Sequence, residues 1–176
     1  ETINLEFRTP YTFKNNQEET IGIFYTDYTL RPNKGGGAWM NTFRSQSKFD
    51  GNIIPLVVNV CNFPPLNEDE VSLLSFEQVE TLFHEFGHAL HGLLSEANYP
   101  SLSGTSVTRD YVEFPSQMME NWAREPEVIK SFARHYKTGQ SIPDDLLGKI
   151  SEAGTFNEGF GTTEYVAAAH LDMAWH

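Results

Sequence analysis

The chain has 176 residues, of which 39% are hydrophobic and 13% aromatic, enough to bury a core and to argue against intrinsic disorder. Its 12 basic and 24 acidic residues give a formal net charge of -12. We therefore expect neither nucleic acid nor an anionic membrane surface as partner, because both require clustered Lys and Arg. No apolar run approaches the roughly 18 residues of a membrane span. The single cysteine, Cys61, favours a cytoplasmic location, although a periplasmic one is also compatible with one thiol.

The two ends of the chain look like cuts through a longer protein. The first residue is Glu1 rather than Met, and His176 interrupts an apparent helix. We predict an α+β fold in which residues 1–176 form one catalytic domain fragment. Residues 1–63 are expected to be rich in strands and residues 64–176 to be helical.

The first third of the chain carries strand and turn signals. Apolar residues alternate with polar ones over 3–7, and a second apolar and aromatic run covers 21–30. The glycine-rich segment 31–37 is a turn signal, after which extended patterns resume over 38–43 and 56–60. Together these segments predict a small antiparallel sheet.

Helical periodicity begins after the proline-rich and acidic segment 64–70. Ser75 followed by Gln78 is a capping-box pattern, and it predicts a helix that runs to about Ser95. Further helices are expected from Pro126 to near Gly139, from Pro143 onward, and over 162–176.

The first of these helices contains the motif His84-Glu85-Phe86-Gly87-His88, an H-E-x-x-H pattern. Residues i and i+4 lie one turn apart on one face, so the two imidazoles can converge on a single ion. The apolar residues of the helix fall in a stripe on the opposite side from the histidines: Val79, Leu82, Phe83, Phe86, Leu90, Leu93 and Leu94. The pattern predicts a core-facing stripe and a metal-facing one.

Two imidazoles with a nearby carboxylate suit zinc, although this argument does not exclude manganese, cobalt or nickel. Glu85 is rotated off the histidine face and is better placed to meet a water molecule at the metal than to bind the metal itself. We therefore expect Glu85 to be the catalytic carboxylate.

The third metal ligand has two candidates, His91 and Glu113. His91 is seven residues from His84, about 10.5 Å along a straight helix, which is too far for one tetrahedral site. Glu113 precedes Pro115, a residue typical of a first helical turn, and the intervening loop is long enough to fold that helix back. Glu113 is therefore favoured, and His91 is expected to contact a ligand residue or to face the substrate.

Two further acidic residues lie near these candidates. Asp110 is expected either to orient a ligating imidazole or to cap a helix, and the sequence favours neither role. Glu120 is interpreted as surface charge rather than as a partner of a ligand.

Three segments together resemble the thimet oligopeptidase family of zinc peptidases: residues 84–91, 102–105 and 109–117. Residues 36–40 and 171–176 favour its bacterial peptidyl-dipeptidase branch. The resemblance implies one zinc ion held by His84, His88 and Glu113, with Glu85 as the catalytic carboxylate. It also implies a larger, mainly helical peptidase that admits short peptides, and a downstream segment with a transition-state histidine. No such segment occurs up to His176, so we expect the fragment by itself to be nearly inert.

The resulting hypothesis is hydrolysis of short peptides, with release of C-terminal dipeptides or internal cleavage; the oligomeric state is left open. Ala38, Trp39 and Met40 form the candidate edge strand for an extended substrate, and the alternative is a hairpin strand with Trp39 in the core. The alternative function is a non-catalytic, zinc-stabilised peptide-binding module. Such a module would require a fourth protein ligand, for which Cys61 is the candidate, although its apolar strand favours a buried thiol.

Overall fold

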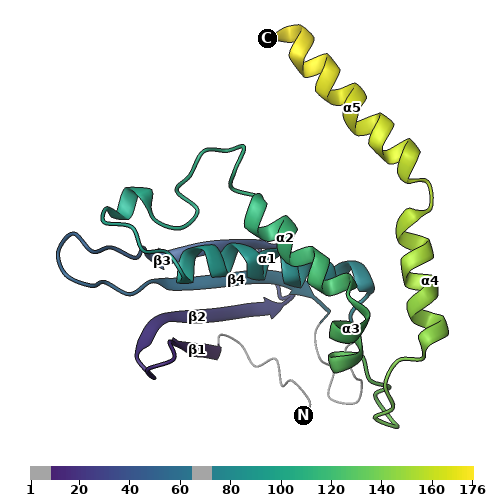
Figure 1. Cartoon of the computed structure of the whole chain (residues 1–176), viewed down its shortest axis with the longest axis horizontal. Helices are drawn as coiled ribbons and strands as arrows, with labels where there is room; N and C mark the ends of the chain where they lie inside the picture. The colour runs from purple at the N-terminus through teal and green to yellow at the C-terminus, as the bar shows by residue number, and fades with distance from the viewer. Residues whose placement is uncertain (1–8, 65–72) are drawn as a thin grey trace. The chain divides into compact units, whose positions relative to one another are not determined.

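The computed structural model describes residues 9–64 and 73–176, so the strand predicted over 3–7 lies outside the described residues. The chain forms two compact units, Glu1–Ala123 and Arg124–His176. The single catalytic domain expected from the sequence stays a prediction. The described elements (Figure 1) are, in chain order, β1 (Thr9–Lys14), β2 (Thr20–Thr29), β3 (Trp39–Arg44), β4 (Leu56–Phe63), α1 (Phe76–Leu93), the 3-10 turn Pro100–Leu102, α2 (Phe114–Arg124), α3 (Pro126–Phe132), α4 (Asp144–Thr155) and α5 (Glu158–Trp175).

The four strands form one mixed sheet in the order β1-β2-β4-β3. β3 pairs antiparallel with β4, as predicted, and β1, for which no strand was predicted, pairs antiparallel with β2. The prediction of an all-antiparallel sheet is wrong for the central pair, because β2 and β4 run parallel. The connection over residues 30–38 is long enough to span two strand spacings of about 4.8 Å, so β4 inserts between β2 and β3. Alternation of side chains cannot reveal this order.

The strand predicted over 38–43 is β3, and it lies at an edge of the sheet, where it pairs with β4. The Trp39 side chain does not enter the core, because the residue is 36% exposed. β1 was not predicted. Its alternating Tyr11 and Phe13 and the turn that follows them were the available signal.

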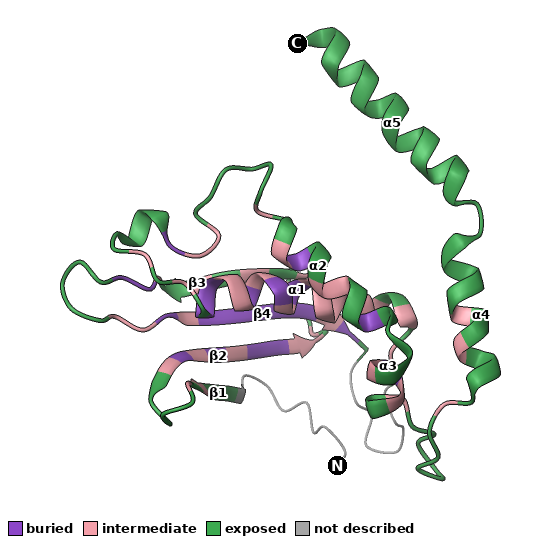
Figure 2. Cartoon of the chain, viewed as in Figure 1, coloured by how far each residue is buried: buried purple, intermediate pink, exposed green. Residues whose placement is uncertain are grey.

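Helix α1 begins as the sequence indicates, with a complete capping box between Ser75 and Gln78. It packs against β4, β3 and β2, and Figure 2 shows buried residues on α1, β4 and β2. The core cluster consists of Phe24, Val57, Ala89 and Leu93.

The face of α1 that packs on the sheet differs from the predicted apolar stripe. Leu94 is 58% exposed, whereas Glu85 and Gly92 are buried. Small residues allow the close approach: a Cβ on Gly92 would lie 2.7 Å from Met40 Cε. Helix and sheet therefore meet along glycine and alanine as well as along the large apolar side chains.

In the unit Arg124–His176, α4 begins directly after Pro143, as predicted. Helix α3 ends at Phe132, earlier than expected, because the chain turns at Gly139 (φ 70°) and an antiparallel bridge joins Arg134 to Ser141. Helix α5 begins at Glu158, ahead of the predicted start at residue 162. Within the described ranges, no helix combines the length and apolar character that crossing a membrane requires.

Candidate metal centre

The two histidines of the motif lie one turn apart on α1. Their ring centroids are 4.9 Å apart, and their side chains are 27% (His84) and 12% (His88) exposed. Burial lowers the pKa of His88, with a smaller contribution from the neighbouring His84, while Glu113 opposes the shift. The neutral imidazole that a metal requires is therefore favoured at His88.

Glu113 is the residue directly before α2, and its side chain approaches both rings. Its Oε2 lies 3.3 Å from His84 Nε2 and 3.1 Å from His88 Nε2. Partial burial raises the pKa of Glu113, but the hydrogen bond from Ser116 and the charges of His88 and His84 outweigh it, so the pKa is lowered overall. The carboxylate is thus ionised at neutral pH.

This group fits a metal ion on geometry and on chemistry. The donor atoms of His84, His88 and Glu113 all lie within 4.8 Å of one another. Two ligands of a tetrahedral zinc, each at 2.0–2.1 Å, are separated by about 3.4 Å, close to the separations from Glu113 to the two rings. Two imidazoles and one carboxylate leave a coordination position open, as in catalytic zinc sites.

Glu120, interpreted from the sequence as surface charge, contacts a histidine of the motif instead. Its Oε1 lies 2.6 Å from His84 Nδ1, which leaves Nε2 directed toward the candidate metal position. Glu113 and Glu120 are seven residues apart, two turns of helix, and that spacing was the available signal. Asp110 is exposed, and among the described residues it forms neither of the two contacts expected of it, with an imidazole or as a helix cap.

Glu85 is 6% exposed and is buried between α1 and the sheet. Burial raises the pKa of its carboxyl, and the charge of Glu113 adds to the shift, while His84 and the backbone of Met40 oppose it. Within residues 9–64 and 73–176, its Oε2 has no hydrogen-bond partner. A carboxylate with a raised pKa and an unused oxygen is suited to accept a proton.

His91 and Cys61 lie outside the group that could hold a metal. The His91 ring is 6.3 Å from the Tyr111 ring, and burial lowers its pKa. His91 also lines a hollow of about 420 Å³ together with Leu102 and Val107. Cys61 is fully buried, which raises its pKa to about 12, as expected of a buried thiol.

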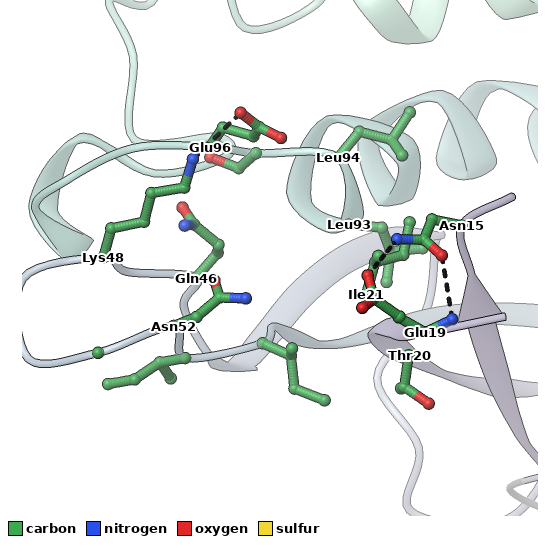
Figure 3. A pocket seen from close by; sticks show the side chains of 14 residues that line it. Asn15, Glu19, Thr20, Ile21, Gln46, Lys48, Asn52, Leu93, Leu94 and Glu96 are labelled. Carbon is green, nitrogen blue, oxygen red and sulfur yellow. Dashed lines mark hydrogen bonds and ion pairs between the residues drawn. The ribbon is translucent and has the colours of Figure 1, made fainter. Parts of the chain in front are cut away.

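A larger hollow of about 770 Å³ lies elsewhere, lined by polar and apolar residues of the β1–β2 turn, the loop before β4 and the end of α1 (Figure 3). Its polar side chains pair with one another: Lys48 forms an ion pair with Glu96, and the Asn15 amide donates a hydrogen bond to Glu19. None of its lining residues belongs to the metal group. The candidate metal group is therefore separate from this hollow.

An H-E-x-x-H helix, a carboxylate from the residue before α2 and a buried glutamate beside the first histidine are features of metal-dependent hydrolases. The chain belongs to peptidase family M3, whose sequence model matches residues 9–176. This confirms the resemblance to the thimet oligopeptidase family seen in the motifs. Members of family M3 are zinc metallopeptidases.

Individual relatives agree with the family. A dipeptidyl carboxypeptidase of Escherichia coli (strain K12) is 47% identical over 156 residues, which are 89% of this chain and 23% of that protein. Oligopeptidase A of the same bacterium is 41% identical over 145 residues, 81% of this chain and 21% of the relative. An organellar oligopeptidase A of Arabidopsis thaliana is 37% identical over 173 residues, which are 94% of this chain and 22% of that protein. The chain thus spans less than a quarter of the length of these relatives.

Proposed function

We propose that this chain carries the catalytic centre of a zinc-dependent peptidase that hydrolyses short peptides, by release of C-terminal dipeptides or by internal cleavage. The observation that carries the proposal is the convergence of His84, His88 and Glu113 beside the buried Glu85. The names of the relatives, a dipeptidyl carboxypeptidase and oligopeptidases, support the two modes of cleavage. We also propose a cytoplasmic location, which the single thiol favours over the periplasm.

In this proposal His84, His88 and Glu113 hold one zinc ion. When bound, zinc supplies a Lewis acid that polarises the scissile carbonyl and lowers the pKa of water. Glu85 takes the proton of the attacking water at its unused Oε2 and delivers it to the leaving amine. Burial of Glu85 raises its pKa toward the range in which a carboxyl can both accept and return a proton.

The substrate is proposed to lie extended beside β3. An edge strand offers free backbone groups that pair with a peptide, and β3 is such a strand, preceded by Ala38. The Met40 backbone is close enough to the Glu85 carboxyl to lower its pKa, so this strand lies beside the proposed catalytic carboxylate. A peptide paired here would run past the metal group.

The alternative, a non-catalytic zinc-stabilised module, accounts less well for the same residues. A structural zinc site is closed by four protein ligands. The described residues provide a group of three, and Cys61 is not part of it. A buried glutamate with an unused oxygen also has no purpose in a closed site.

The test is Glu85→Gln in the full-length protein. We expect one zinc per chain to remain bound, while peptide cleavage falls by about 10²–10⁴-fold, the usual contribution of a general base. Zinc content is measured by atomic absorption, and cleavage of short peptides by chromatography. The products also distinguish dipeptide release from internal cuts.

Glu77→Gln is the matched control, because Glu77 is an exposed residue in the first turn of the same helix. It should retain both zinc and activity. Unchanged turnover in Glu85→Gln would remove Glu85 from the catalytic role.

A further inference from the structure

Gly87, inside the H-E-x-x-H motif, lies where α1 meets the start of α2. A Cβ at this position would lie 2.5 Å from Ser116 Cα and 2.6 Å from Pro115 O. Both are backbone atoms, so no side-chain rotation could relieve the overlap. The first turn of α2 therefore rests directly on the bare backbone of Gly87.

That same turn holds Glu113. Ser116 is fully buried, and its hydroxyl donates to Glu113 Oε2 at 2.9 Å and to the Glu113 carbonyl oxygen at 2.8 Å. The contact with Gly87 thus fixes the turn, and Ser116 fixes the carboxylate on it. This is the carboxylate oxygen that lies 3.1 Å from His88 Nε2.

A metal site tolerates only small displacements of its ligands, so the contact at Gly87 matters for the position of Glu113. Non-bonded carbon atoms settle at about 3.5–4.0 Å, so an added methyl group would displace α2 by about 1 Å. Metal–ligand distances are held within about 0.2 Å. A displacement of that size takes Glu113 out of reach while both histidines, on α1, stay in place.

We propose that Gly87 is a positioning residue for the metal centre: its missing side chain, together with Ser116, sets the place of Glu113. The inference rests on the zinc site of the proposed function. It differs from a purely structural role of Gly87, which would affect stability without affecting the metal.

The experiment measures zinc affinity by chelator competition and the visible spectrum of the Co²⁺-substituted full-length protein. Gly87→Ala should weaken zinc binding by about 10–100-fold, the range typical for residues that support metal ligands. The cobalt spectrum should shift toward that of Glu113→Gln, because both variants lose the same ligand.

Gly92→Ala is the matched control. Its Cβ would lie 2.7 Å from the flexible end of Met40, against the sheet and not against α2. We expect it to lower thermal stability while zinc affinity and the cobalt spectrum stay unchanged.

A double-mutant cycle tests the route through Glu113. If Gly87 acts on Glu113, adding Glu113→Gln to Gly87→Ala should cost little further affinity. The proposal would be overturned if the losses of zinc affinity in the two single variants multiplied in the double variant. Unchanged zinc affinity in Gly87→Ala would also overturn it.

If Gly87→Ala does not fold, the same cycle is carried out with Ser116→Ala, since this variant removes only the hydroxyl that binds Glu113. Unchanged zinc affinity in Glu113→Gln alone would instead refute the ligand set of the proposed function.

Discussion

His84 has an acidic partner at each ring nitrogen. Glu120 lies at Nδ1 at 2.6 Å, and Glu113 lies at Nε2 at 3.3 Å. A carboxylate at one nitrogen fixes the ring orientation and makes the other nitrogen a stronger metal ligand. The candidate metal centre therefore includes Glu120 in addition to the three candidate ligands.

This arrangement predicts that Glu120→Gln weakens zinc binding by about 10-fold, within the range for partners of metal ligands. Glutamine can still hydrogen-bond the ring but carries no negative charge. Chelator competition in the full-length protein measures the effect. Asp110→Asn serves as the control and should bind zinc as the unchanged protein does, and equal losses in both variants would contradict the role given to Glu120.

At the level of elements, the turn after β2 is tied to the sheet by a buried ion pair. The Lys34 side chain is 4% exposed, and its ammonium group donates to Asp27 and to the carbonyl oxygens of Thr29 and Cys61. Arg31 adds two hydrogen bonds to Asp27. These contacts join the end of β2 to β4. They thereby fix the connection over residues 30–38, which passes β4 to reach β3.

Replacing Asp27 by Asn should lower the free energy of unfolding by about 3 kcal/mol, because a buried ammonium loses its counter-charge. Chemical denaturation measures the loss. Glu96→Gln, which breaks the exposed pair with Lys48, is the control and should cost less than about 1 kcal/mol.

The pH dependence of stability provides a second measurement. Burial raises the pKa of Asp27, but the hydrogen bonds from Arg31 and Lys34 outweigh it, so the pKa lies below its usual value of 3.8. The stabilisation is therefore complete above that value and is lost as the pH falls through the lowered pKa. Asp27→Asn should remove this loss of stability in the acid range. If the free energy of unfolding fell with pH in the same way in the variant, the role of Asp27 would be contradicted.

For the whole molecule, the apolar core and the metal group are built from different side chains. Phe24, Val57, Ala89 and Leu93 form the core without any of the candidate ligands. The fold is therefore expected to persist when the metal is removed, unlike that of a small zinc-stabilised module.

Chelation of the full-length protein should abolish peptide cleavage, and added zinc should restore it, while the far-UV circular dichroism stays unchanged. Loss of a ligand present at 100 times its dissociation constant removes about 2.7 kcal/mol of stability, so the melting temperature should fall without unfolding at 25 °C. Unfolding on chelation would favour the non-catalytic module.

The sequence alone predicts the parts of this protein that depend on local spacing. The H-E-x-x-H pair, the capping box at Ser75 and the helix start before Pro115 follow from contacts within one or two helical turns. The choice of Glu113 over His91 also follows from helix geometry, and the structure brings Glu113 to both rings.

The tertiary structure alone decides what depends on contacts between distant segments. The parallel pairing of β2 with β4, the burial of Glu85 against the sheet and the contact of Glu120 with His84 join residues that are far apart in the chain. Side-chain periodicity reports which face of an element is apolar, but not which neighbour covers it. The contact of α2 with Gly87 is also a tertiary contact. The need for a glycine at this position of the helix is visible only when the position of the opposing backbone is known.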